Sequence, residues 1–167
     1  MALVALCVLL SQTQRLHSSV EIGSISEVRG NAQVLRDKPY GAELQFNIQQ
    51  MDDVRTEAGR VAITFEDNST VKLTEHSKLV IDEYIYDPDP SKSKMALKFA
   101  SGTARFITGK FNNKSNISIR TPTANIAIRG TDFTCTVDEL GRSLVILLPD
   151  ENGISSGEIL VSTAMGS

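Results

Sequence analysis

The 167-residue chain has no tryptophan, and only 5% of its residues are aromatic. Proteins that bind single-stranded nucleic acid stack bases on aromatic side chains, and such platforms would be hard to build here. The chain also has no run of lysine or arginine, and its formal net charge is −3, from 17 basic and 20 acidic residues. The basic patch that attracts a phosphate backbone is therefore missing, and we expect no nucleic-acid partner.

Cysteine is scarce as well, with Cys7 in an apolar run at the N-terminus and Cys135 in a strand-like segment. The two thiols could form a disulfide only if the N-terminus packed on the rest of the chain. Because an unpaired cysteine behaves as a small hydrophobic residue, we expect Cys135 to be buried and unpaired. A chain of this length can bury a core without the help of disulfides or metal.

The N-terminal apolar run, Met1 to Leu10, is too short to span a bilayer as a helix, which takes about 20 residues. It has the length of the hydrophobic part of a signal peptide, but the positive residues that precede such a part are missing. Residues 1–19 therefore predict a degenerate export signal, and a short helix packed on the domain or a misassigned start fits the same residues. Residues 20–167 are expected to form a single domain.

The signatures of common enzymes are missing too: the chain has no His-Glu-x-x-His, Cys-x-x-Cys, phosphate-binding glycine loop or Gly-x-Ser-x-Gly. His76 lies in a polar link between apolar runs, where we expect a surface or turn histidine. Carboxylates do occur in pairs, but neighbours on a strand point to opposite faces and do not converge. The pairs are Asp52-Asp53, Asp82-Glu83, Asp87 with Asp89, and Asp150-Glu151. We expect no catalytic residue, no metal site and no cofactor.

From Ile22 onward, apolar and polar residues alternate with a period of two, which is typical of half-buried strands. The alternating apolar sets are Val61, Ile63 and Phe65; Val71 and Leu73; Ile117 and Ile119; Ile126 and Ile128; and Phe133, Cys135 and Val137. Leu144 to Leu148 is apolar throughout, and we interpret it as a strand buried on both faces. Outside the N-terminal run, only Phe46 to Arg55 predicts a short helix.

Turn signals separate these runs at short intervals, as in β-sandwiches, barrels and rolls. Glu66 to Ser69 predicts a hairpin connection, because Asp and Asn tolerate the left-handed backbone of a tight turn. Asp87 to Lys94 contains two prolines and predicts an exposed loop. We therefore predict an all-β fold of stacked antiparallel sheets, either a β-sandwich or an irregular β-roll or solenoid-like arrangement.

The segment from Ile126 to Phe133 has a more specific pattern. Gly130 stands between two strand-like stretches, which indicates a bulge, a corner or a close approach of two backbones. Val28-Arg29-Gly30 resembles Ile128-Arg129-Gly130, which is compatible with stacked β-layers of similar shape. We expect Thr131 to form local hydrogen bonds and Phe133 to fill the core, rather than to form a ligand site.

On these residues the chain resembles a FecR-like domain over about residues 22 to 138. The resemblance rests on the order and spacing of several short motifs, since each alone is weak. In chain order these are Gly30 before Ala32 to Leu35, Asp52-Asp53-Val54-Arg55-Thr56, Gly59 with Ala62 to Phe65, Glu66 to Ser69 where the family usually has Asp-Gly-Ser, Leu73 with Ser77 to Leu79, Ser101-Gly102, Thr121-Pro122, and Gly130-Thr131-x-Phe133. The residues singled out for a structural role or for contact with a partner are Gly130, Thr131, Phe133, Gly59, Asn68 and Gly102.

The resemblance implies an extracytoplasmic, all-β module. Together with the missing catalytic patterns, it leads us to expect that the chain is not an enzyme. In the protein that gives the family its name, this module senses the occupancy of an iron-citrate transporter and passes the signal inward to a sigma factor. The present sequence shows no cytoplasmic helical region before the domain and no convincing transmembrane helix. We therefore do not expect the chain to relay a signal across a membrane by itself.

Several functions fit this sequence. The leading hypothesis is a binding or structural module that docks a protein or a cell-envelope surface through sheet edges and loops, with self-association through those edges. The alternatives are a phage virion or surface-assembly subunit, in which residues 1–19 pack on the domain, and the sensor part of an iron-uptake signalling system. An enzyme that acts on polysaccharide through a carboxylate pair is a further, less favoured hypothesis. The expected location is the periplasm, the cell surface, the medium or a phage particle.

Overall fold

The computed structural model describes residues 20–164 except 90, 111–115, 150–152 and 155–156. These residues form twelve strands and no helix, which confirms the predicted all-β fold. No segment among them is a helix long and apolar enough to cross a membrane. Residues 1–19, on which the predictions of an export signal and a packing helix fall, lie outside the described part of the chain.

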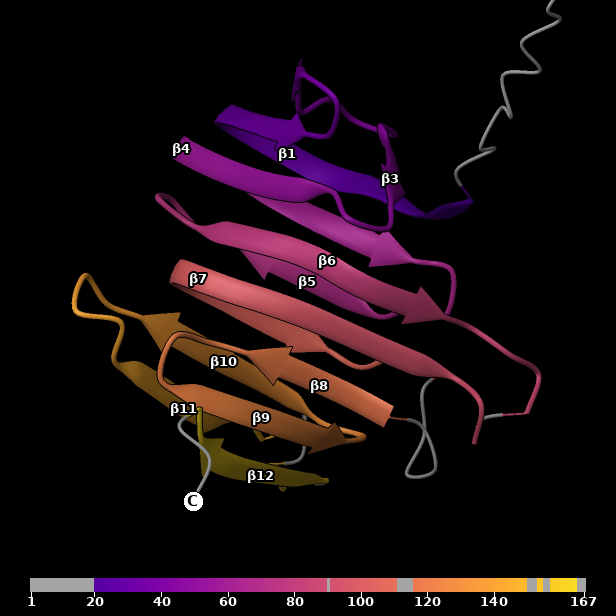
Figure 1. Cartoon of the computed structure of the whole chain (residues 1–167), viewed down its shortest axis with the longest axis vertical. Coiled ribbons are helices and arrows are strands. Elements are labelled where there is room, and N and C mark those ends of the chain that lie inside the picture. Colours follow the sequence, from indigo (N-terminus) through magenta and orange to yellow (C-terminus); the bar gives the residue numbers. More distant parts are fainter. Residues whose placement is uncertain (1–19, 90, 111–115, 150–152, 155–156, 165–167) are drawn as a thin grey trace, which may run out of the picture.

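Three long strands set the architecture: β1 (Glu21–Leu35), β4 (Asp53–Phe65) and β7 (Lys94–Ile107). The first residues of β4 pair with β6, and its last residues pair with β5. In the same way, β7 pairs first with β6 and β8 and then with β5 and β10. The sheet therefore folds over on itself, so that each long strand runs through two packed layers (Figure 1).

Each layer has its own order of strands. The first layer contains β12 (Glu158–Thr163), β9 (Ala124–Arg129), β8 (Asn116–Arg120), the first half of β7, β6 (Lys78–Ile85), the start of β4, the end of β1, and β2 (Pro39–Gly41). The second contains β11 (Ser143–Leu147), β10 (Asp132–Val137), the second half of β7, β5 (Thr70–Leu73), the end of β4, the start of β1, and β3 (Asn47–Gln49). Figure 1 shows β5, β10 and β11 behind the strands of the first layer. Paired strands are antiparallel as predicted, except that β8 runs parallel to β7.

The core lies between the two layers. The alternating side chains predicted to point inward are buried, and Phe65, Phe99 and Phe133 are among the largest that are fully buried. The ring of Phe106 stacks on Phe133 with centroids 5.0 Å apart, and it meets Phe99 edge-on at 6.1 Å. Because aromatic rings bury large areas, this cluster joins both layers through one apolar contact.

Glycine allows the long strands to turn from one layer into the other. Gly59 of β4 lies opposite Gly30 of β1, and a Cβ atom on Gly59 would lie 2.5 Å from the carbonyl oxygen of Asn31. Gly102 of β7 has a φ of +91°, and its Cβ would lie 2.6 Å from the Cα of Ser77. Only a residue without a side chain fits such close approaches of two backbones.

The change Gly102→Ala is expected to lower the free energy of unfolding by about 2 kcal/mol, because it adds both backbone strain and a steric clash. Gly41→Ala is the matched control, since no atom lies within 4 Å of its Cβ position and its φ is not left-handed. The control should change stability by less than about 0.5 kcal/mol. Urea denaturation of both variants measures the difference, and equal effects would show that the corner at Gly102 is not constrained.

The predicted helix over Phe46 to Arg55 is wrong. This segment contains β3, a turn and the start of β4. Met51 has a left-handed φ of 70°, which a helix does not permit, and the carboxylate of Asp52 accepts a hydrogen bond from the backbone N–H of Gln49 at 2.9 Å. A side chain that satisfies the backbone locally in this way favours a turn over a helix.

The prediction that Leu144 to Leu148 is buried on both faces is also wrong. Leu144 is 59% exposed and Ile146 is 48% exposed. Their side chains share the outer face of the second layer with Thr136 and Thr134, their partners in the ladder. This strand, β11, lies at the edge of its layer and pairs with β10 alone among the described strands.

Candidate protein-docking edge

Gly130, Thr131 and Phe133 shape the connection between the layers. Gly130 has a left-handed φ of 55° where the chain leaves β9 in the first layer for β10 in the second. The carbonyl oxygen of Thr131 accepts hydrogen bonds from the backbone N–H and the hydroxyl of Thr108, at 3.3 and 3.1 Å. The hydroxyl of Thr131 bonds locally to the carbonyl of Asp132, as predicted, and Phe133 is fully buried. These residues therefore have structural roles.

Asn68 has a left-handed φ of 66° in the hairpin between β4 and β5, which confirms the predicted connection. The neighbouring carboxylate of Asp67 is fully buried. It accepts hydrogen bonds from the hydroxyl of Tyr84 at 3.0 Å, from the backbone N–H of Ser69 at 3.2 Å and from the hydroxyl of Ser69. Burial and the nearby Asp67 carboxylate raise the pKa of Tyr84, so the phenol remains a hydrogen-bond donor.

The residues singled out from the sequence do not form one site. The hairpin at Asn68 lies beside Gly109, whose N–H donates to the hydroxyl of Ser69 at 2.9 Å. The adjacent Thr108 contacts Thr131, so this end of the strands contains the Asn68 turn and the Gly130 corner. Gly59 and Gly102 lie at the corners in the middle of β4 and β7, where these strands change layers. Within each layer, the corners are at the opposite end from Asn68 and Gly130. The six residues therefore determine shape at two separate ends.

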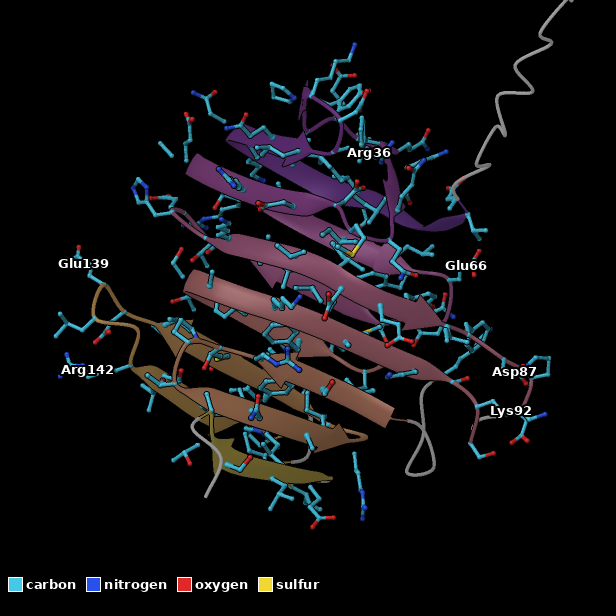
Figure 2. All side chains as sticks on the ribbon, in the orientation of Figure 1. Arg36, Glu66, Asp87, Lys92, Glu139 and Arg142 are labelled. Atoms are coloured by element: carbon cyan, nitrogen blue, oxygen red, sulfur yellow. The ribbon has the colours of Figure 1, made fainter. Side chains whose placement is uncertain are left out.

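The paired carboxylates diverge, as the alternation of strand side chains predicted. Their ion-pair partners are Arg36 for Asp52, Arg55 and Lys78 for Asp53, Lys98 for Asp82, and Lys94 for Glu83. Asp87 and Asp89 accept hydrogen bonds from backbone N–H groups of their own loop, and Figure 2 shows Asp87 and Lys92 at the tip of that loop. His76 is exposed, in the turn between β5 and β6. The pair Asp150 and Glu151 lies outside the described residues.

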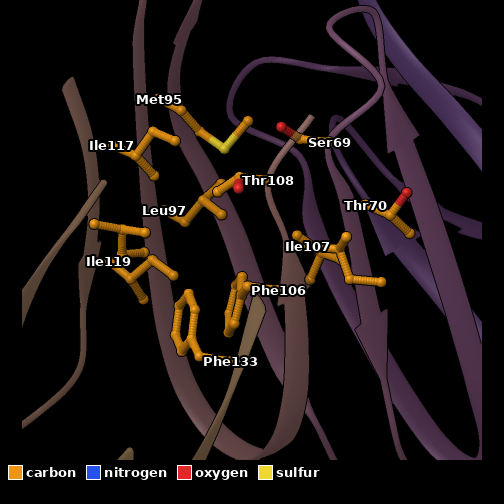
Figure 3. Close-up of a pocket in the computed structure, with 12 residues that line it drawn as sticks. Ser69, Thr70, Met95, Leu97, Phe106, Ile107, Thr108, Ile117, Ile119 and Phe133 are labelled. Atoms are coloured by element: carbon orange, nitrogen blue, oxygen red, sulfur yellow. The ribbon is translucent and has the colours of Figure 1, made fainter. Parts of the chain in front are cut away.

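The cavity between the layers, shown in Figure 3, is small and apolar. Its volume is about 20 Å³, and Met95, Leu97, Phe106, Ile119 and Phe133 are among the side chains that line it. A cavity of this size has room for about one water molecule, which would need several polar partners to stay there. The space is therefore a packing gap, and it does not bring reactive groups together.

Polar and reactive groups inside the fold are satisfied or inert. Every buried side-chain nitrogen and oxygen of the described residues has a hydrogen-bond partner. The same residues contain no group of three or more histidine, cysteine or acidic side chains that could hold a metal ion. Cys135 is fully buried, as predicted, and burial raises the pKa of its thiol to about 11. A thiol that stays protonated at neutral pH is a poor nucleophile.

At the C-terminal side of the two layers, several apolar side chains are exposed. Six of them belong to the last strands and their connections: Leu140, Leu144, Ile146, Ile154, Leu160 and Val161. Figure 1 places β11 and β12 together at this side of the molecule. Figure 2 shows Glu139 and Arg142 at the tip of the hairpin that leads from β10 into β11. We define the docking edge as β11 together with β12.

The opposite side of the fold ends in the short strands β2 and β3, which have three residues each. The outer edge of β1 pairs with β3 near its start and with β2 near its end. Between these, the backbone of Ile25 accepts a hydrogen bond from the N–H of Gln45 at 2.8 Å and donates one to the carbonyl of Phe46 at 3.0 Å. Very short edge strands offer few backbone groups to another strand, so the two sides of this domain differ in the length of edge that they present.

The amino-acid sequence did not predict this edge, because the apolar run from Leu144 to Leu148 resembles an interior strand. One signal could have corrected it. Pro149 follows the run directly, and proline is typical of strands at the edge of a sheet. The apolar run alone cannot distinguish the two situations, because burial of both faces of a strand depends on whether another layer packs on each face.

The family model described as "FecR protein" matches residues 52–149, which is more than half of the chain and runs from the start of β4 to just past β11. No curated protein and no solved structure matches the chain. Strands β1 to β3 and β12 lie outside the matched region, whereas β11 lies within it. The order of the corner glycines, the Asn68 hairpin and the Gly130-Thr131-x-Phe133 segment thus occurs within a recognised unit, and the chain belongs to the FecR family.

Proposed function

We propose that this domain is a non-enzymatic binding module that docks a protein partner along β11 and β12, outside the cytoplasm. The observation that carries the proposal is the exposed apolar face of β11, where Leu144 and Ile146 project from an edge strand. Exposed apolar side chains beside unpaired backbone groups are what a strand-adding partner needs, because the backbone gives affinity and the side chains give specificity.

Two further observations support this proposal. FecR-family domains in general are regulatory sensors in iron-uptake signalling rather than enzymes, and such sensors act through protein contacts. The described interior holds paired or satisfied polar groups and a packing gap, so the surface is the better candidate for function. The extracytoplasmic location follows from the family resemblance and is part of the proposal.

A photo-crosslinking amino acid placed at Ile146, in cells that produce the chain naturally, tests this function. We expect a crosslinked product heavier than one chain, and we expect the additional change Leu144→Lys to abolish it. The matched control carries the crosslinker at Lys72, an exposed position on β5 in the middle of the same layer. No product from Ile146, or equal products from both positions, would contradict docking at this edge.

A further inference from the structure

Strand β11 lacks the devices that keep an exposed edge from pairing. Its five residues are Ser143, Leu144, Val145, Ile146 and Leu147, none of them charged or proline. Natural edge strands are usually blocked by an inward charge, a lysine, a proline or a bulge. The pairing of β11 with β10 is continuous, without a bulge. Nothing within the strand therefore opposes the addition of another strand.

The backbone of β11 shows which groups are available. The N–H of Leu148 donates to the carbonyl of Asp132 at 2.8 Å, and the N–H of Asp138 donates to the carbonyl of Arg142 at 3.0 Å. Hydrogen-bonded and non-bonded pairs alternate along an antiparallel ladder. The even-numbered residues of β11 therefore direct their backbone groups toward β10. Ser143, Val145 and Leu147 direct theirs away from the sheet.

We propose that β11 pairs antiparallel with β11 of a second copy of this chain, centred on Val145. This proposal rests on the proposed function, because it names the partner of the same edge. With Val145 opposite itself, Ser143 lies opposite Leu147 of the second copy. All of these residues have outward-directed N–H and C=O groups, so the pairs form a regular ladder. This register aligns all five residues of β11 with those of the second copy.

The side chains of β11 suit a partner of identical sequence. Antiparallel pairing about Val145 places Leu144 opposite Ile146 of the second copy, and the reverse on the other side of the axis. Both are exposed in the single chain, and apolar cross-strand pairs of this kind stabilise a sheet. Because a two-fold interface uses the same patch on both copies, the patch must be complementary to itself, and a charge-free strand meets that condition.

Charges beside the strand also fit this arrangement. Arg142 precedes β11 and pairs with Asp138 of its own hairpin, with Nε and Oδ2 2.7 Å apart. In the antiparallel arrangement, Arg142 lies opposite Leu148 of the second copy, so the two arginines are at opposite ends of the interface. A two-fold axis perpendicular to the sheet also keeps the core-facing sides of both copies on the same side of the joined sheet. Val145 and Leu147, which are half-buried in one chain, then continue the core across both copies.

The mass of the purified chain in solution, measured by sedimentation velocity and light scattering, tests the proposal. We expect two chains for the natural sequence and one chain for Val145→Pro. Proline is suited to this position because the N–H that it removes points away from β10, so the pairing with β10 is kept. Circular dichroism checks that the variant keeps its strands. If Val145→Pro does not fold, Ile146→Lys replaces it, with the same loss of half the mass expected.

Leu140→Lys is the matched control. Leu140 is 76% exposed, so Leu140→Lys places a charge on the surface as Ile146→Lys does. Leu140, however, lies at the hairpin tip outside β11. This control should keep the mass of two chains. A natural sequence that sediments as one chain, or a folded Val145→Pro that keeps two, overturns the proposal. If the crosslinker at Ile146 then captures a different protein, in a Leu144-dependent way, the proposed function stands and only the second copy is rejected as the partner.

Discussion

Replacing Arg36 with methionine is expected to lower the free energy of unfolding by about 4 kcal/mol, because it leaves a buried carboxylate without its cation. The side chain of Asp52 is fully buried, and that of Arg36 is 28% exposed. The Nε of Arg36 donates to Oδ1 of Asp52 and its Nη2 donates to Oδ2, both at 2.7 Å. This two-point contact holds the β1–β2 loop against the turn before β4.

The surroundings of Arg36 strengthen the pair. Its Nη2 also donates to the carbonyl of Asn47 at 3.0 Å, and its guanidinium lies 5.6 Å from the ring centroid of Phe46 and 5.8 Å from that of Tyr40. The hydrogen bond to Asp52 raises the pKa of Arg36, so the cation is present at all ordinary pH values. Methionine retains much of the apolar stem but none of these polar contacts.

Arg29→Met is the control for this prediction. Arg29 pairs with Glu27 at 3.1 Å, but the two side chains are 79% and 50% exposed. Water screens such a pair, so its loss should cost less than about 1 kcal/mol. Urea denaturation of both variants gives the comparison. Similar losses for Arg36→Met and Arg29→Met would refute a stabilising role for the buried contact, whereas adding Asp52→Asn to Arg36→Met should recover part of the loss.

Replacing Phe133 with alanine is expected to lower the free energy of unfolding by about 4 kcal/mol. Phe133 is fully buried in the second layer, and its ring stacks on Phe106 with an angle of 12° between the planes. It lies beside the small cavity between the layers, so truncation enlarges an existing gap (Figure 3). The loss combines apolar surface that is no longer buried with contacts that the surrounding side chains cannot replace.

Leu140→Ala is the control for Phe133→Ala. It shortens an apolar side chain that is 76% exposed, so the expected change is within about 0.5 kcal/mol. Denaturation followed by intrinsic tyrosine fluorescence measures both variants, since the chain has no tryptophan. A small loss for Phe133→Ala would mean that the core closes over the missing ring, and it would remove Phe133 from the residues that join the two layers.

The strands were predicted well wherever one face is polar. The inward residues of β5, β8 and β10 alternate with polar neighbours, and the structure buries them as predicted. Local chemistry also sufficed for the Glu66–Ser69 hairpin, where Asn68 takes the left-handed conformation. In these cases, the short-range pattern and the final environment agree.

Predictions failed where the environment comes from distant segments. The Phe46–Arg55 segment has helix-compatible residues, but Asp52 is held by Arg36, which precedes it by 16 residues in the chain. The docking edge is the second case. Leu144 and Ile146 are exposed because they lie on the outer face of the second layer, and their apolar run does not show whether another layer packs on that face. The separation of Gly59 and Gly102 from Gly130 and Asn68 required the ladder registers, which no local pattern contains.

By itself, the amino-acid sequence determined the all-β fold class, the Glu66–Ser69 turn and the family, because each depends on neighbouring residues or on motif order. Only the tertiary structure decided that three long strands pass through both layers, that Asp52 pairs with Arg36, and that β11 has a single neighbour among the described strands. These properties arise from contacts between residues far apart in the chain, and burial is a property of the assembled fold rather than of any segment.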